Sequence, residues 1–253
     1  MKGFLDIPYR LPFADYYKDF DRGFYVDFPK QLNLMGRWLR QYGCKTTLDI
    51  GAMTGGCIDY ISRLGIRMDG VQFTQDIKRM AAARLKKAGI RSKLFVSPVH
   101  ETLHVSTKKK YDGIVSLGWF NLPFTRTQLK HTLDKTHELL APNGIFLFDF
   151  FEFKEVKVAP TETLRLGDDI VYISHAELLG NVLRKYHLWI RKKSAAPLLE
   201  TSDLIDRTTD DARALLAGSG LTLLKTKFLN LNYPREFWLA QKTLRSKAPL
   251  MVE

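Results

Sequence analysis

The sequence predicts an α/β fold: a doubly wound, mostly parallel sheet that carries an antiparallel β insertion. From about residue 46 to residue 150, short apolar runs typical of buried strands alternate with amphipathic runs typical of helices. This alternation is characteristic of parallel strands joined by crossover helices. After Phe150 the pattern changes to period-two alternation around Gly180 and Asn181, which indicates an antiparallel hairpin. Open sheets of this class bind ligands at the carboxyl ends of their strands.

Each expected element follows from a local pattern of apolar residues. Runs of apolar residues bounded by turn residues mark strands, and apolar residues three or four apart mark helices, as Leu129, Leu133 and Leu140 do. The predicted helices lie at about 29–42, 55–64, 75–88, 128–140 and 208–218. The predicted strands of the main sheet lie at 47–50, 68–73, 92–96, 112–117, 145–150, 221–230 and 236–242, with a turn, "APNG", at 141–144. The predicted strands of the hairpin are "DDIVYISHAELL" and "NVLRKYHLWIRKK".

The whole chain, residues 1–253, is predicted to form one domain. It contains no internal repeat, low-complexity segment or long linker, and its length suits a single domain with an ample core. Within it we expect an N-terminal helical cap over residues 1–45 and the antiparallel insertion over residues 155–200.

Composition argues against several classes of protein. No apolar run reaches the roughly 18 residues of a membrane span, and the first residues, MKGFLDIPYR, lack the apolar core of a secretion signal. We therefore expect a cytoplasmic protein without membrane association. The chain's two cysteines, Cys44 and Cys57, fit neither a metal-ligand spacing nor a disulfide framework, so no metal site is predicted. The sequence does not indicate an oligomeric state.

The chain is strongly basic, with 39 Lys and Arg residues against 27 Asp and Glu residues and a net charge of +12. Residues 78–93 carry basic side chains and no acidic one, and Lys108–Lys110 forms a basic triplet. A nucleic-acid partner is one explanation of this charge. A solvated helix face is the simpler one, because no RNA-binding motif or stacking aromatic residues accompany the charge.

The stretch "TTLDIGAMTGG", residues 46–56, has the outline of a cofactor-binding loop. A strand ends in Asp49, and Gly51 and Gly55 follow before a helix. Glycines let a ligand approach the backbone, and the N-terminus of a helix offers free N–H groups. A tight turn with two glycines can also serve only packing, so the loop needs support from the rest of the chain.

That support comes from four motifs that occur in order: "LDIGAMTGG", "MDGVQFTQDIKRMAAARL", "YDGIVSLGWFNL" and "ELLAPNGIFLFDFFE". In sequence and spacing they resemble the class I S-adenosylmethionine-dependent methyltransferases, from about Tyr16 to Lys242. The similarity is greatest to the small-molecule branch, which inserts antiparallel strands after the fifth strand of its sheet. "FADYYKDFDRGF" resembles the segment that covers the cofactor in that branch. The resemblance implies a Rossmann-like, seven-stranded sheet and S-adenosyl-L-methionine as cofactor. It also implies methyl transfer to oxygen, nitrogen or carbon of a small, partly aromatic metabolite.

The resemblance also implies which residues form the site. The expected cofactor-binding residues are Tyr16, Asp49, Gly51, Ala52, Met53, Gly55, Gln72, Phe73, Val99, Ser116 and Leu117. The candidate catalytic residues are Tyr17, His175 and His187. Tyr17 comes from the covering segment, and each histidine lies on an inserted strand, where a neutral imidazole can accept a proton. For each of the three, a structural role is the alternative.

Three departures from the family pattern fall in the cofactor pocket. Met53 replaces the second loop glycine, and Gln72 replaces the acidic residue at the end of the second strand. The adenine-facing acid of the family is also absent, because Ser97 and Pro98 stand where it is expected. A glutamine offers one neutral acceptor where a carboxylate offers two charged oxygens. The alternative function is therefore a methyltransferase-fold protein that does not transfer methyl. Such a protein would be a non-methylating catalyst, for example a cyclase, or a partner subunit of another enzyme.

Overall fold

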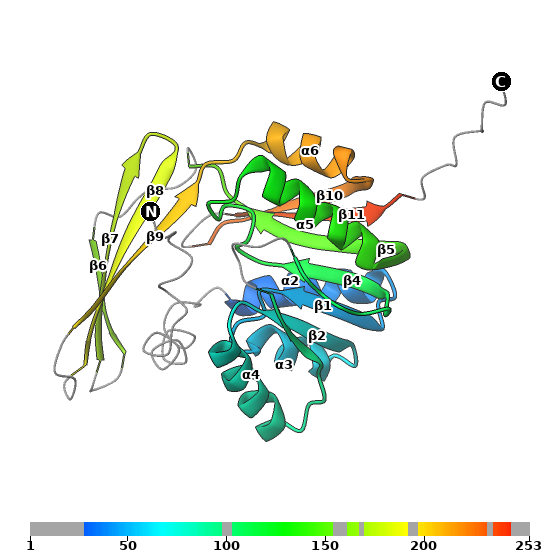
Figure 1. The fold of residues 1–253 in the computed structure, drawn as a ribbon, viewed down its shortest axis with the longest axis horizontal. Helices are drawn as coiled ribbons and strands as arrows, with labels where there is room; N and C mark the ends of the chain where they lie inside the picture. Colours follow the sequence, from blue (N-terminus) through cyan, green and yellow to red (C-terminus); the bar gives the residue numbers. More distant parts are fainter. Residues whose placement is uncertain are drawn as a thin grey trace.

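The computed structural model describes residues 28–97, 103–153, 161–166, 170–191, 197–231 and 235–243. Seven strands form one sheet in the order β10-β11-β5-β4-β1-β2-β3 (Figure 1). Their bounds are β1 Thr46–Ile50, β2 Arg67–Gln72, β3 Leu94–Val96, β4 Tyr111–Ser116, β5 Leu140–Phe150, β10 Leu221–Leu229 and β11 Arg235–Lys242. Strands β1 to β5 pair in parallel, whereas β11 runs antiparallel to both β5 and β10. The predicted seven-stranded, mostly parallel sheet is confirmed.

Helices cover both faces of this sheet, as a doubly wound fold requires (Figure 1). Their bounds are α2 Phe28–Gln41, α3 Gly56–Arg63, α4 Gln75–Lys87, α5 Arg126–Leu139 and α6 Thr209–Gly218. The buried apolar residues of α2 and α3, with Leu85 of α4, belong to one core cluster. Those of α5 and α6 belong to a second cluster on the opposite face.

The strand β5 shows why the central strands read as continuous apolar runs. Phe146, Phe148 and Phe150 belong to the core under α5 and α6, whereas Ile145 and Leu147 belong to the core under α2 and α3. Successive side chains of a strand point to opposite faces, so a strand buried on both faces must be apolar at nearly every position.

The inserted strands form a second, four-stranded antiparallel sheet in the order β6-β7-β8-β9, which lies to one side of the main sheet (Figure 1). Its strands are β6 Thr161–Leu166, β7 Ile170–Leu179, β8 Val182–Arg191 and β9 Leu198–Ile205. The predicted hairpin around Gly180 and Asn181 is confirmed, because Leu179 pairs with Val182 across that turn. The two flanking strands were not predicted, and β9 extends beyond residue 200. The division of the chain into a single domain with a cap over residues 1–45 stays a prediction.

Two element boundaries differ from the predictions for local reasons. Helix α5 begins at Arg126 because Thr125 and Gln128 form a capping box, in which each side chain bonds the backbone N–H of the other residue. Strand β5 begins at Leu140, so the expected turn at 141–144 lies within the strand. There Leu140 pairs with Tyr111 before the register shifts, and Asn143 takes a positive φ of 60°.

Candidate functional site

The predicted loop lies at the carboxyl end of β1, against the end of β2. The backbone N–H groups of Gly51 and Ala52 both donate to the carbonyl oxygen of Val71, at 3.0 Å each. Gly51 and Gly55 have φ values of +85° and +81°, which are left-handed conformations that glycine adopts without strain. A Cβ atom on Gly51 would stand 3.1 Å from the ring of Phe73. The loop therefore folds closely around positions where only glycine fits.

Met53, the residue at the position of the second loop glycine, takes a left-handed backbone conformation. Its φ is +43°, in the left-handed region, where a side chain crowds the backbone at a cost of about 1–2 kcal/mol. The side chain is partly exposed. The loop therefore places a flexible thioether at a left-handed position.

Asp49 is almost completely buried beneath this loop, with 3% of its surface exposed. Burial raises the pKa of its carboxyl from the ordinary 3.8 to about 7, and a hydrogen bond from the Cys57 thiol opposes this only in part. Cys57, in the first turn of α3, also lies 3.9 Å from the sulfur of Met68, and its own pKa is raised, chiefly by burial. Near neutral pH, Asp49 can therefore exist in both protonation states.

Gln72 ends β2 and is fully buried. Among the described residues, neither its Oε1 nor its Nε2 atom has a hydrogen-bond partner. An unsatisfied buried polar group costs about 1–3 kcal/mol, so native structures rarely keep one without a reason. The neighbouring Phe73 is half-buried and packs against the core under α5 and α6. The Gln72 amide therefore keeps its acceptor oxygen and two donor hydrogens without a partner among the described residues.

Ser116 and Leu117 bring the end of β4 to the same place. The Ser116 hydroxyl donates to the carbonyl oxygen of Ile50 at 3.1 Å, which ties the ends of β4 and β1 together. Leu117 packs against the core under α2 and α3. The expected cofactor-binding residues within the described ranges thus gather at the ends of three neighbouring strands. That they line one cleft stays a prediction, and Tyr16, Tyr17, Pro98 and Val99 lie outside the described residues.

The two candidate histidines lie on opposite faces of the inserted sheet. His175 pairs with Tyr186, and the adjacent Ser174 pairs with His187; paired residues share a face and neighbours in sequence do not. The rings of His175 and Tyr186 stack with centroids 6.0 Å apart. His187 Nε2 lies 2.8 Å from the Ser202 hydroxyl, and burial lowers the pKa of His187 to about 4. The two histidines therefore cannot act together in one site.

A buried ion pair behind the site was not predicted. Asp149 of β5 has no exposed surface, and it accepts hydrogen bonds from the backbone N–H of Gly118 and from Arg235 Nη1, the latter at 2.7 Å. Arg235 also stacks 5.5 Å from the ring centre of Phe151. The signal that could have found the pair is the single acid in the apolar run "FLFDFF", since a buried carboxylate needs a partner.

The structural role of Asn121 was also not predicted from the sequence. It is 1% exposed, and its Nδ2 donates to the carbonyl oxygens of Phe151 (2.9 Å) and Ile205 (3.0 Å). Its Oδ1 accepts from the N–H of Phe151 at 3.1 Å. The side chain therefore joins the loop after β4 to the end of β5 and to the last residue of the inserted sheet. The neighbouring Trp119 and Phe120 are buried in the core.

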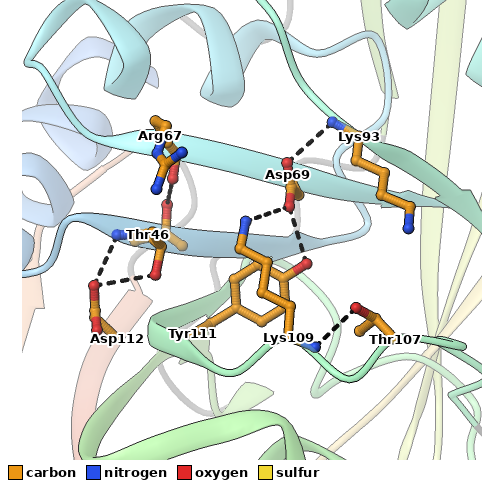
Figure 2. Close-up of polar contacts among 9 residues, drawn as sticks. Thr46, Arg67, Asp69, Lys93, Thr107, Lys109, Tyr111 and Asp112 are labelled. Atoms are coloured by element: carbon orange, nitrogen blue, oxygen red, sulfur yellow. Dashed lines mark hydrogen bonds and ion pairs between the residues drawn. The ribbon is translucent and has the colours of Figure 1, made fainter.

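A polar network at the amino-terminal parts of the strands pairs some of the chain's positive charge with a carboxylate (Figure 2). Asp69 of β2 accepts from the Lys93 N–H (3.0 Å), Lys109 Nζ (2.7 Å) and the Tyr111 hydroxyl (3.0 Å). Burial by itself raises the pKa of Asp69, but these hydrogen bonds outweigh it and the net shift is downward. Because β4 begins at Tyr111, this network lies away from the glycine loop and holds strands together.

The described part of the chain contains neither a metal cluster nor a membrane-spanning helix. Over those residues, no group of three or more His, Cys, Asp or Glu side chains is arranged to hold a metal ion. Within the same ranges, every helix is too short or too polar to cross a membrane.

Comparison with known proteins supports the resemblance. Residues 47–144 match the family model of a methyltransferase domain. A S-adenosylmethionine-dependent methyltransferase from Clostridium acetobutylicum has a similar structure, with a TM-score of 0.74 and 16% identity over 92% of this chain and 98% of that one. An amino pentose methyltransferase from Micromonospora echinaspora, solved with S-adenosylmethionine bound, gives a TM-score of 0.73 and 16% identity over 90% and 96%.

A sugar N-methyltransferase from a Streptoalloteichus species gives a TM-score of 0.74 and 17% identity over 90% of this chain and 93% of that one. A search of curated protein sequences finds no match. At such low identities the structural likeness shows the fold alone. Together with the match over residues 47–144, it places the chain among proteins with the class I methyltransferase fold.

Proposed function

We propose that this chain, with a methyltransferase domain over residues 47–144, binds S-adenosyl-L-methionine and transfers its methyl group to a small metabolite. The observation that carries the proposal is the buried amide of Gln72, which lacks a partner among the described residues, beside a loop that keeps glycine geometry. A pocket that no longer bound a ligand would be expected to lose the unsatisfied amide as well, because burying such a group costs free energy.

The residues of the loop fit the parts of this cofactor. The Gln72 amide has one acceptor and two donor hydrogens, which suits the two ribose hydroxyls. The ring of Phe73 can pack against adenine, and Asp49 in its ionised form can attract the ammonium group of the methionyl end. The bound cofactor supplies an electrophilic methyl group. The protein's task is to exclude water and to orient the acceptor, since a base is needed only where the acceptor carries a proton.

Of the candidate catalytic residues, we place His187 nearest the acceptor. It lies on the same face of the inserted sheet as Leu183, which packs against Phe151 and Phe153 at the end of β5. Its lowered pKa keeps the imidazole neutral at neutral pH, so the ring can accept a hydrogen bond, but the same shift makes it a weak base. Tyr17 stays a candidate from the sequence. Two structural neighbours are an amino pentose methyltransferase and a sugar N-methyltransferase, and this supports a small acceptor for the present chain.

The test measures binding of S-adenosylhomocysteine by calorimetry in matched variants. Gln72→Glu should tighten binding about tenfold, because charged hydrogen bonds to the ribose replace neutral ones at a gain of about 1–2 kcal/mol. Gln72→Leu should weaken binding by a similar factor. The control is Gln75→Glu, the same chemical change at an exposed position of α4. Equal affinities for the wild type, Gln72→Glu and Gln72→Leu would show that Gln72 does not face the ribose.

A second candidate function is a methyltransferase-fold protein that does not transfer methyl. The left-handed Met53 and the neutral Gln72 favour it, because both change the pocket while leaving the fold intact. Ligand at about 100 times its dissociation constant should stabilise the native state by about 2.7 kcal/mol. If the purified wild type is not stabilised by millimolar S-adenosylmethionine or S-adenosylhomocysteine, this second function replaces the first.

A further inference from the structure

The two faces of the inserted sheet have different surroundings. On its inner face, Leu183 is buried and packs with Ala176 and Leu204 against Phe151 and Phe153. Its outer face carries the odd-numbered residues of β7 and β9 and the even-numbered residues of β8, because paired residues share a face. The inner face therefore belongs to the core, and the outer face is directed away from it.

The outer face bears an apolar cluster of five residues in register. Ile173, Leu188 and Leu199 form one cross-strand row, and Val171 and Ile190 form the next. None of the five is buried, and Leu199 and Ile190 are 63% and 38% exposed. Single exposed apolar residues are ordinary, but a contiguous apolar patch on a sheet marks an interaction surface.

The charges on this face set it apart from the rest of the chain. Across β7, β8 and β9 this face carries one basic residue, Arg184, against the acids Glu177 and Asp203, and the register also places Arg165 of β6 on it. Arg184 forms a two-point ion pair with Asp203, at 2.8 and 2.9 Å, and Glu177 bonds the Tyr186 hydroxyl. The chain as a whole carries +12, so two copies repel each other least where this excess is absent.

We infer that the outer face of the inserted sheet binds the same face of a second copy of this chain, in a two-fold symmetric dimer. Isologous contact of this kind matches each patch with itself, and stacked sheets about 10 Å apart bury their facing apolar side chains. Four strands of six to ten residues give a footprint of roughly 500 Å² per copy, or about 1,000 Å² in total, at the lower limit for a specific interface. Because His187, the candidate nearest the acceptor, lies on the opposite, inner face, dimerisation through the outer face and acceptor binding are compatible.

The test is the mass of the native protein in solution, measured by size-exclusion chromatography with light scattering. The wild type should show about twice the chain mass of 29.1 kDa at micromolar concentration. Leu199→Glu places a charge in the centre of the interface and should weaken association at least about tenfold. The matched control is Leu224→Glu on β10, where the leucine is 41% exposed on the main sheet; it should leave the mass unchanged.

Circular dichroism checks that each variant is folded, and Leu199→Ser replaces Leu199→Glu if the glutamate prevents folding. A monomeric wild type overturns the inference. If Leu199→Glu also destabilises that monomer, part of the same chain covers the outer face. A dimer that survives both Leu199→Glu and Ile190→Glu also overturns it, since edge-to-edge pairing of strands would then explain the association.

Discussion

Replacement of Asp49 by asparagine should stabilise the ligand-free protein and weaken its binding of the cofactor. Burial raises the pKa of this carboxyl to about 7 from the ordinary 3.8 that it regains on unfolding. Its contribution to stability is therefore fully present below pH 3.8 and is lost as the pH rises through about 7. Linkage gives a penalty of about 2 kcal/mol near pH 5.5 and about 4 kcal/mol near pH 8.5. Asparagine has nearly the same shape, does not ionise and escapes this penalty.

The assay is urea unfolding of the wild type and Asp49→Asn at about pH 5.5 and 8.5, with calorimetry of S-adenosylhomocysteine binding. The stability advantage of the variant should grow by about 2 kcal/mol between the two pH values, or by about 4–8 °C in melting temperature for a chain of this size. Asp134→Asn, in an exposed ion pair with Lys130, is the control and should show no such trend. An advantage that is absent, or equal at both pH values, refutes the argument that burial keeps Asp49 from ionising.

Two further substitutions test the loop and the buried ion pair. Met53→Gly should raise cofactor affinity several-fold, because it frees space beside the ligand. It should change stability by less than about 1 kcal/mol, because relief of the left-handed strain is offset by the greater chain entropy of glycine; unchanged or weaker binding in calorimetry argues against the loop's role. Asp149→Ala leaves the Arg235 guanidinium without its carboxylate and should lower the unfolding free energy by about 2–4 kcal/mol. Asp134→Ala, in the exposed pair, should cost less than about 1 kcal/mol, and equal losses in urea unfolding would contradict the burial argument.

The sequence by itself determined the architecture of the main sheet and the place of the loop. Period and length of the apolar runs distinguish buried strands from amphipathic helices, and both are local properties. The glycines of the loop marked a turn for the same reason, because glycine takes conformations such as those of Gly51 and Gly55 without strain. The opposite faces of His175 and His187 were also implicit. A two-residue turn at Gly180 and Asn181 fixes the register, and the register fixes the faces.

Only the tertiary structure decided which polar groups meet. Asp149 and Arg235 are 86 residues apart in the chain, and no local pattern relates them, because their contact depends on β11 lying beside β5. Asn121 likewise finds its partners through the return of the inserted sheet to the core. The complete burial of Gln72 follows from how the elements pack around the end of β2. Local periodicity specifies which face of an element is apolar, whereas pairing between distant elements specifies which buried polar group is satisfied and which is not.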